Sequence, residues 1–259
     1  MRSIKEINKL IKDSSERVTL QSFIIEGKKL VGDFLRFRDL ITYVVVDEDR
    51  FKSDEQLQSV VKSVQNMEIP LYFVVANTFK RVSSVRTPQG ILAEIKMRHF
   101  NLADVLKKQK ILITVGDVIQ DPANVGVLVR NSLAFGCDAV VFTTGSADVY
   151  SPKSIRTASC CIVDIPIFYL NQDELIGLKE SGVQFVVSIL EGNKSLHGIT
   201  RIPSKSAVVF GNEGAGISKR LVQHADESFF IPISEKVNSL NITSAVAVTL
   251  FHMSYLHTK

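Results

Sequence analysis

Residues 111–130 read ILITVGDVIQDPANVGVLVR, and this stretch decides the fold of the second half of the chain. The apolar run at 111–115 has the composition of a buried strand. Asp121 and Pro122 are typical of a helix entry, because proline suits the first helical turn. We therefore predict a strand followed by a helix over 124–135. This unit is the repeat of a parallel α/β sheet, in which ligands bind at the carboxyl ends of the strands.

The same order of apolar run and polar loop occurs twice more. AVVF at 207–210 leads into GNEGAG at 211–216, and FFIPI at 229–233 leads to NSLN at 238–241. Three glycines in six residues let the backbone approach a ligand closely. GNEGAG matches neither the dinucleotide fingerprint G-x-G-x-x-G nor a phosphate loop ending in Lys-Ser/Thr. A nicotinamide enzyme is therefore disfavoured.

Each block also has an ordinary structural explanation. Asn124 suits a helix cap, GNEGAG a strand-to-helix turn, and Ser239 or Asn241 a cap for the last helix. Asn124 and Arg130 lie six residues apart, within about 120° on one helix, and a guanidinium there can hold a phosphate bidentately. Glu213 places a carboxylate in a loop at a helix N-terminus. The residues alone leave both explanations open.

Taken together, the three blocks resemble the signature motifs of the SpoU/TrmH family of RNA ribose 2′-O-methyltransferases, in the SPOUT superfamily. Asn-x-Gly-x-x-x-Arg at 124–130 and Gly-Asn-Glu-Gly-x-Gly at 211–216 match, and Ser-Leu-Asn-Ile-Thr at 239–243 differs only where the family has Val-Ser. Further stretches extend the resemblance over essentially the whole chain: SPKSIR at 151–156, FIIEGKKL at 23–30 and TPQGI at 87–91.

This resemblance implies an α/β protein of two parts. The C-terminal part would be a parallel-sheet methyltransferase domain whose chain forms a deep trefoil knot. The N-terminal part would be a small α/β/α RNA-binding domain of a ribosomal-protein type. We accordingly predict an RNA substrate-binding domain at 1–98, a linker at 99–110 and a methyltransferase domain at 111–259.

The resemblance also implies methyl transfer from S-adenosylmethionine to a ribose 2′-hydroxyl of RNA. Large-subunit (23S-type) ribosomal RNA is favoured as substrate, because a separate N-terminal domain is more usual among ribosomal-RNA members. A tRNA substrate is the alternative, and a non-catalytic RNA-binding or ribosome-assembly protein is a remote one. Family members are dimers, so we expect a homodimer.

By the same resemblance, individual residues receive roles. The catalytic residues would be Asn124, Arg130, Glu213, Ser239 and Asn241. Cofactor contacts would come from the backbone around Gly211, Ile231 and Leu240. Because arginine hardly loses its proton in proteins, we expect Arg130 to hold the RNA phosphate while the proton passes to Glu213 or water.

The distribution of charge favours a polyanion partner for the first part. Residues 1–100 hold 17 Lys and Arg against 13 Asp and Glu, so the net charge of +4 lies entirely there. A basic module beside a neutral one is typical of nucleic-acid binding joined to chemistry, although a solvated face is the ordinary explanation. The candidate RNA-binding residues in this part are Lys80, Arg81 and Arg86, and the resemblance of SPKSIR at 151–156 to the family adds Lys153 and Arg156.

Composition excludes other classes of protein. At 259 residues with 45% hydrophobic and 22% charged residues, the chain has the composition of a globular protein. No apolar run approaches the roughly 18 residues of a membrane helix, and the N-terminus lacks a signal-peptide core, so we expect a cytoplasmic protein without a membrane partner. Cys137, Cys160 and Cys161 are too few and wrongly spaced for a disulfide framework or a zinc site. We expect buried, reduced cysteines and no metal.

The predicted elements alternate through both parts. In the first part we predict helices at 3–13, 28–36, 54–65 and 77–85, and strands at 23–25, 41–46, 71–75 and 91–95. After a helical connector at 101–110, we predict strands at 111–115, 139–143, 162–165, 184–189, 207–210 and 228–233. The remaining predicted helices are 152–159, 172–181, 217–224 and 239–256. Strands separated by helices imply parallel pairing in this second part.

Overall fold

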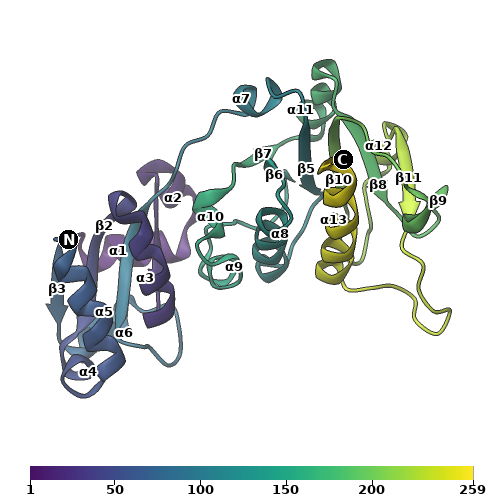
Figure 1. Cartoon of the computed structure of the whole chain (residues 1–259). Coiled ribbons are helices and arrows are strands. Elements are labelled where there is room, and N and C mark those ends of the chain that lie inside the picture. The colour runs from purple at the N-terminus through teal and green to yellow at the C-terminus, as the bar shows by residue number, and fades with distance from the viewer. Residues whose placement is uncertain (259) are drawn as a thin grey trace. The chain divides into compact units, whose positions relative to one another are not determined.

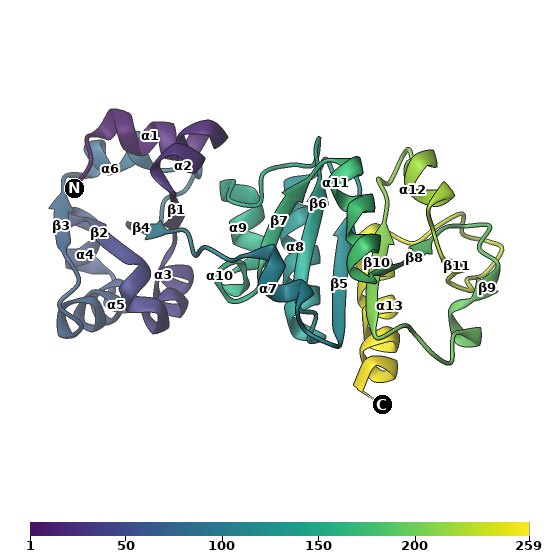
Figure 2. The same cartoon turned by 90° about the horizontal axis from the view of Figure 1, so that it is seen from above.

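The computed structural model describes residues 1–258 and divides into two compact units (Figures 1 and 2). Unit 1 combines Met1–Arg98 with Tyr150–Cys160. Unit 2 combines His99–Val149 with the chain from Cys161 onward. A segment from the middle of the sequence therefore belongs to the compact unit formed by the N-terminal residues.

Unit 1 contains a mixed four-stranded sheet. Its strands are β1 (Ser22–Glu26), β2 (Ile41–Asp47), β3 (Leu71–Val74) and β4 (Ile91–Lys96), in the order β1-β4-β2-β3. β4 is antiparallel to both β1 and β2, whereas β3 is parallel to β2. The helices of this unit are α1 (Ile4–Lys12), α2 (Ser14–Leu20), α3 (Lys28–Phe34), η1 (Leu35–Leu40), α4 (Glu48–Ser53), α5 (Glu55–Asn66), α6 (Ala76–Val82) and α9 (Pro152–Ala158).

The predicted first helix ends where a new one begins. Asp13 terminates α1, and its side chain accepts a hydrogen bond from the backbone N–H of Ser15, which caps α2. The aspartate competes with the continuing helix by bonding locally, as short acidic side chains do. Asp47 caps α4 in the same way, with bonds from Asp49 and Arg50. Neither α2 nor α4 was predicted from the sequence.

Unit 2 contains a seven-stranded sheet in which every pairing is parallel. Its strands are β5 (Ile111–Gly116), β6 (Ala139–Thr143), β7 (Ile167–Leu170), β8 (Gln184–Ser188), β9 (Lys194–Ser195), β10 (Lys205–Phe210) and β11 (Glu227–Phe230), in the order β7-β6-β5-β10-β8-β11-β9. The helices are α7 (Leu102–Leu106), α8 (Pro122–Ala134), α10 (Cys161–Asp164), α11 (Gln172–Gly177), η2 (Leu178–Ser181), η3 (Leu196–Gly198), α12 (Lys219–Gln223) and α13 (Ile242–Thr258). The predicted parallel α/β architecture is confirmed.

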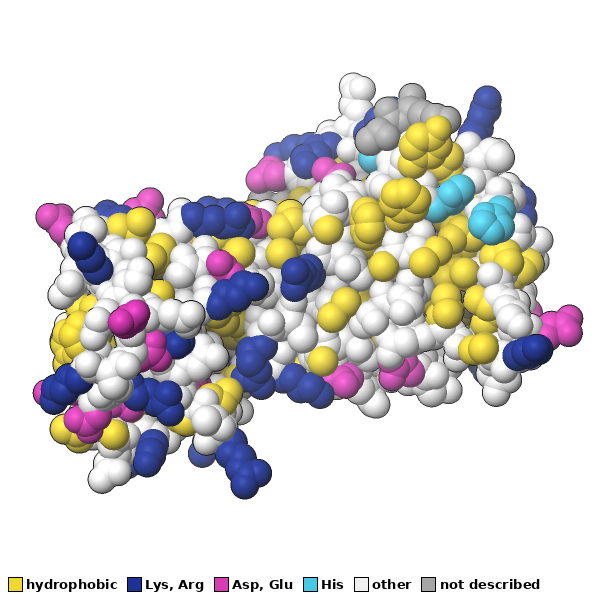
Figure 3. Space-filling view, turned by 60° about the horizontal axis from the view of Figure 1, so that its bottom comes forward, with side chains coloured by type: hydrophobic (Ala, Val, Ile, Leu, Met, Phe, Trp, Pro, Cys, Tyr) yellow, Lys and Arg dark blue, Asp and Glu magenta, His cyan; other side chains and the backbone are white. Residues whose placement is uncertain are grey.

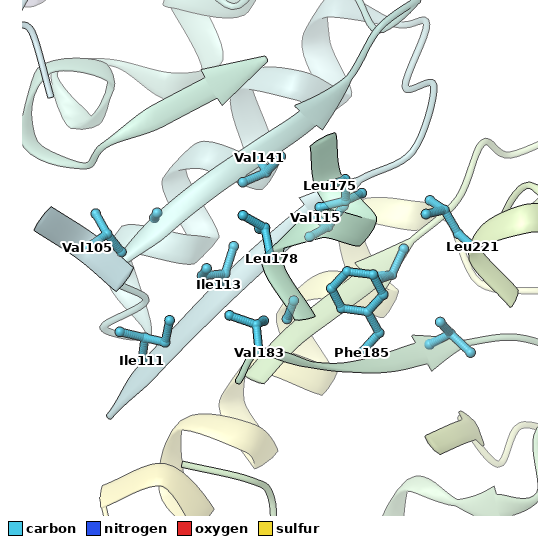
Figure 4. Close-up of a cluster of buried hydrophobic side chains, with 14 of the residues drawn as sticks. Val105, Ile111, Ile113, Val115, Val141, Leu175, Leu178, Val183, Phe185 and Leu221 are labelled. Carbon is cyan, nitrogen blue, oxygen red and sulfur yellow. The ribbon is translucent and has the colours of Figure 1, made fainter. Parts of the chain in front are cut away.

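Strand alternation places helices on both faces of this sheet. Ile111, Ile113 and Val115 of β5 point into a buried cluster with residues of η2 and β8 (Figure 4). Thr114 points to the opposite face, where its hydroxyl accepts a hydrogen bond from Ser132 of α8 at 2.8 Å. α13 packs against α8. Nδ2 of Asn131 in α8 donates a hydrogen bond to the carbonyl of Thr243 in the first turn of α13.

The strand predicted at 162–165 is wrong. Residues Cys161–Asp164 form α10, and the strand is β7, which begins directly after Pro166. A short apolar run does not distinguish a buried strand from a buried helical turn, and Ile162 and Val163 are both buried here as parts of a helix. The last predicted strand is also shorter, because β11 ends at Phe230, ahead of Pro232.

Two expectations based on composition have mixed outcomes. Cys137 is buried as expected, but Cys160 and Cys161 are half-buried, and no disulfide joins cysteines within residues 1–258. Within residues 1–258, no helix has the length and apolar character that crossing a bilayer requires. The knotted path expected for the last segment stays a prediction.

Candidate functional site

The three sequence blocks meet at the side chain of Glu213. Its Oε1 accepts a hydrogen bond from Nδ2 of Asn124 at 2.9 Å and another from Nδ2 of Asn241 at 3.4 Å. Asn124 lies in the first turns of α8 after β5, Glu213 follows β10, and Asn241 precedes α13. Because parallel strands end at one edge of the sheet, loops distant in sequence converge there.

Asn241 combines the capping role with a contact to Glu213. Its Oδ1 accepts hydrogen bonds from the backbone N–H of Thr243 at 2.8 Å and from the Thr243 hydroxyl at 2.6 Å, which caps α13. Capping orients the carboxamide so that Nδ2 faces Glu213. Asn124 is not the cap of α8, because Asp121 holds that position by accepting from the N–H of Ala123. The side chain of Asn124 is therefore left to contact the carboxylate.

The glycine-rich loop is a tight turn that turns Glu213 outward. The backbone of Asn212 pairs with that of Gly216 in both directions, at 3.0 and 2.8 Å. Gly216 has φ +70°, a left-handed conformation that glycine adopts without steric cost. A Cβ at Gly211 would clash with the backbone of Gly216 and Ile217. The turn thus needs glycine at both of its ends.

Glu213 lines two adjacent cavities. The larger has a volume of about 1030 Å³, and it is lined by residues 188–191, 210–217, 230–235 and 237–242 together with Ala245. It includes all three predicted cofactor contacts, Gly211, Ile231 and Leu240, and also the predicted catalytic residue Ser239. The smaller has a volume of about 270 Å³, and it is lined by Ile119, Gln120, Asp121, Asn124, Asn212, Glu213, Gly214 and Ile242. A group placed in either cavity can therefore reach the same carboxylate.

The larger cavity fits a cationic cofactor. It carries the carboxyl groups of Glu191, Glu213 and Glu235, and none of the described residues that line it is Lys or Arg. A nucleotide phosphate would meet like charge there, whereas a sulfonium cation would meet opposite charge. Ile231 and Leu240 add apolar surface for a flat ring. S-adenosylmethionine, which has both a sulfonium and an adenine, matches this set of groups.

Two predicted catalytic residues remain outside the contacts of Glu213. Arg130 is exposed on α8, lines neither cavity, and forms no hydrogen bond or ion pair with other residues in 1–258. Ser239 forms no hydrogen bond within the same part of the chain, although it lines the larger cavity. An exposed guanidinium without a protein partner is free to bind a phosphate.

The predicted RNA-binding residues all lie in unit 1. Lys80 and Arg81 occupy the last turn of α6, and Arg86 follows in the loop before β4. Lys153 and Arg156 lie on α9, which belongs to the same unit although it comes from the second half of the sequence. All five are exposed, and Lys and Arg side chains are frequent on the surface shown in Figure 3. The membership of α9 in unit 1 could not be foreseen from motif order.

The two N-terminal stretches of the resemblance contact each other. The backbone N–H of Lys28 donates to Oε1 of Gln89 at 2.9 Å, and the N–H of Gly27 donates to the carbonyl of Ile91 at 3.0 Å. Glu26 accepts from the hydroxyl of Ser83 and from the N–H and hydroxyl of Ser84. These bonds fix both sides of the loop that carries the candidate RNA contact Arg86.

Two residues that line this site, Asn212 and Asp121, are not among those predicted from the sequence. Asn212 and Asp121 line the smaller cavity, and Asn212 also organises the glycine-rich loop through its side chain. Asn212 stands within the GNEGAG block itself, so its position beside Glu213 was the available signal. Asp121 has a signal in the sequence only as part of a helix entry.

Fold and site together define an α/β RNA methyltransferase with an additional substrate-binding unit. The chain belongs to the SpoU rRNA Methylase family, whose model matches residues 111–251. A second model, the MRM3-like substrate binding domain, matches residues 2–93. The expected activity, S-adenosylmethionine-dependent 2′-O-methylation of RNA ribose, is confirmed by this membership and by the relatives below.

Similarity to individual proteins extends over both units. The 23S rRNA (guanosine(2553)-2′-O)-methyltransferase RlmP of Bacillus subtilis is 30% identical over 247 residues, covering 95% of this chain and 93% of that protein. The 23S rRNA (guanosine-2′-O-)-methyltransferase RlmB of Neisseria meningitidis is 27% identical, covering 77% and 82%. The AdoMet-bound rRNA methyltransferase of Sinorhizobium meliloti superimposes with a TM-score of 0.79 at 24% identity, covering 96% and 92%, and shares the fold.

Proposed function

We propose that this protein methylates the ribose 2′-hydroxyl of a guanosine in large-subunit (23S) ribosomal RNA. The observation that carries the proposal is Glu213, held by Asn124 and Asn241 between two adjoining cavities. The relatives from Bacillus subtilis and Neisseria meningitidis are named as 23S rRNA guanosine 2′-O-methyltransferases, and they support this choice of RNA and nucleoside. The N-terminal unit supports it too, because its family model is a substrate-binding domain.

A ribose 2′-hydroxyl is a weak nucleophile that must be oriented and deprotonated. In the smaller cavity, the hydroxyl faces Asn124 and Glu213, and the carboxylate accepts its proton directly or through a water. The amides of Asn124 and Asn241 restrict the rotamer of Glu213, so that a free lone pair points at the hydroxyl. Within residues 1–258 the hydrogen-bond partners of the Glu213 side chain are these two neutral amides.

Arg130 holds the phosphate next to the target ribose. Its fork of N–H donors matches a phosphate bidentately and fixes the nucleotide relative to Glu213. The residues around Gly211, Ile231 and Leu240 bind S-adenosylmethionine in the larger cavity, and Ser239 contributes a hydroxyl to its wall. When bound, this cofactor supplies a methyl group on a sulfonium, so in-line positioning contributes much of the rate.

In this proposal, one part of the chain binds RNA and the other carries out methyl transfer. Residues 1–98 bind the RNA through Lys80, Arg81 and Arg86, residues 99–110 link the parts, and residues 111–259 carry the methyltransferase site. Lys153 and Arg156 add basic side chains to the RNA-binding unit. An enzyme that modifies ribosomal RNA works where ribosomes assemble, so we place the protein in the cytoplasm.

We further propose a homodimer that buries one face of α13. Val248, Phe251 and Tyr255 are spaced three and four residues apart, so they share a helix face, and they are 46%, 68% and 57% exposed. Phe251 also meets Phe135 edge-to-face, which extends the apolar surface onto α8. Hydrophobic side chains gather beside histidines on this unit in Figure 3. Sedimentation should show a dimer for the protein and a monomer for Phe251→Glu, and a monomeric wild type would reject this interface.

The test of the proposed function is a methylation assay on RNA that lacks the modification. Total RNA from a strain deleted for this gene is incubated with the protein and methyl-labelled S-adenosylmethionine, separated by size, and mapped by resistance of the methylated position to alkaline cleavage. Label at one guanosine of 23S RNA is expected. Label confined to tRNA would replace the substrate, and absence of label in every RNA and in assembled subunits would reject the enzyme activity.

A further inference from the structure

Val118, two residues after β5, has a left-handed backbone conformation with φ +52°. Among non-glycine residues such a φ is uncommon, and for a β-branched side chain it is a steric outlier. A conformation of this kind persists only where the surrounding structure enforces it, and such residues cluster at functional sites. Contacts on two sides of Val118 hold it in this conformation.

On one side, Val118 is held through a buried carboxylate. Its backbone N–H donates to the hydroxyl of Thr143 at 2.8 Å, and that hydroxyl donates to Oδ1 of Asp117 at 2.8 Å. Oδ2 of Asp117 accepts the backbone N–H of Ser218 at 2.7 Å. Asp117 and Thr143 are each only 1% exposed. The carboxylate of Asp117 thus connects the ends of β5 and β6 to Ser218, which follows the glycine-rich loop.

On the other side, Val118 is held by the glycine-rich loop itself. Its carbonyl accepts Nδ2 of Asn212 at 3.0 Å, while Oδ1 of the same Asn212 accepts the N–H groups of Gly214 and Ala215. An ordinary negative φ at Val118 would rotate this peptide and turn the carbonyl away from Asn212. The left-handed conformation therefore ties the loop before α8, and with it Asn124, to the loop that carries Glu213.

We propose that Asp117, Thr143 and Asn212 are positioning residues for methyl transfer, acting through Val118 to hold Glu213 against Asn124. We call this set of contacts the Val118 clamp. This inference rests on the proposed function, because it assigns a purpose to the fixed position of Glu213. Asp117 and Thr143 line neither cavity, so their effect on the rate is transmitted through the two loops.

A matched pair of variants at Thr143 tests the clamp. Thr143→Val removes the hydroxyl and keeps the volume, Thr143→Ser keeps the hydroxyl, and Thr144→Val changes an exposed neighbour outside the clamp. In single-turnover methylation we expect Thr143→Val to lose roughly 10- to 100-fold in rate, with Thr143→Ser and the control within about threefold of wild type. S-adenosylmethionine affinity, measured by calorimetry, should change much less than the rate. A Thr143→Val protein that is folded and as fast as wild type would overturn the proposal.

Amide hydrogen exchange supplies a second readout that needs no RNA. In Thr143→Val, we expect faster exchange at Ser218 and in the peptide covering residues 211–217, with unchanged exchange in the strands of unit 1 as evidence of folding. Unchanged exchange in the glycine-rich loop would overturn the clamp. Failure of the proposed function can be told apart from failure of the clamp. In that case the wild-type protein does not methylate RNA, but amide exchange still shows whether Thr143→Val loosens the glycine-rich loop.

Discussion

Nδ2 of Asn124 lies 2.9 Å from Oε1 of Glu213, although 89 residues separate the two in sequence. The contact joins a helix that follows β5 to a loop that follows β10, and these two strands are neighbours in the sheet. Two neutral amides, not a cation, therefore hold the carboxylate in place. This arrangement fixes the orientation of the Glu213 carboxylate relative to both loops.

Glu213→Gln should abolish most of the activity without unfolding the protein. The substitution keeps the shape of the side chain but removes the anionic acceptor, and loss of a general base typically costs about 10²–10⁴ in rate. Because Glu213 is exposed, the free energy of unfolding should change by less than about 0.5 kcal/mol. Single-turnover methylation and urea unfolding measure the two effects. A variant that methylates at the wild-type rate would show that water, not Glu213, takes the proton.

Arg130→Ala should lower methylation while cofactor affinity stays near normal. Arg130 lines neither cavity, so the substitution should remove only the proposed contact with an RNA phosphate, at a cost of about 2–4 kcal/mol in transition-state stabilisation. Arg130→Lys is the matched control, because it keeps the charge and loses the planar fork, and its rate should fall between those of wild type and the alanine variant. The measurements are single-turnover rates and cofactor titration by calorimetry. Equal rates for all three proteins would remove Arg130 from the site.

Replacing Lys80 and Arg81 together by alanine should weaken RNA binding and flatten its salt dependence. Each lost phosphate contact reduces the slope of log affinity against log salt by about 0.7–0.9. The matched control is Lys52→Ala with Lys62→Ala, which removes the same charge from α4 and α5. Filter binding at several salt concentrations gives both slopes. If the two double variants behave alike, RNA is attracted by net charge and not by the end of α6.

The strands and the motif residues of the site could be predicted from the sequence, because both depend on short, contiguous stretches of residues. Apolar runs located nine of the eleven strands to within a few residues, the strand predicted at 162–165 is a helix, and the shortest strand, β9, has no signal of its own. The motif blocks pointed to Asn124, Glu213 and Asn241, and the sheet brings these three together. Parallel order explains this, because each block follows a strand that ends at the same edge.

Periodicity does not encode the conformation of loops or the packing of units. Nothing in the residues around Val118 predicts a left-handed backbone, since glycine or asparagine would be the usual choice there. The clamp depends on Thr143 at the end of β6 and on Asn212 in the glycine-rich loop, and neither residue signals from sequence that it contacts Val118. In the same way, the segment Tyr150–Cys160, which includes α9, belongs to unit 1 through tertiary contacts such as that between the tilted rings of Tyr150 and Phe23.

The stability of unit 1 should depend on pH through Asp54. A hydrogen bond from Lys28, and then one from the backbone N–H of Leu57, holds the pKa of Asp54 below its ordinary value. The folded state therefore binds this proton less readily than the unfolded state, so the stabilisation is present above the unfolded pKa of about 3.9 and is lost as pH falls through the folded pKa. Asp54→Asn keeps a side-chain oxygen to cap α5 and removes only the ion pair. In urea unfolding, the free energy of unfolding of wild type should exceed that of Asp54→Asn by about 0.5–1 kcal/mol at pH 7, and this difference should shrink below about pH 4. Lys28→Gln should lose a similar amount at pH 7, and a difference that persists undiminished at pH 3 would show that the ion pair is not its source.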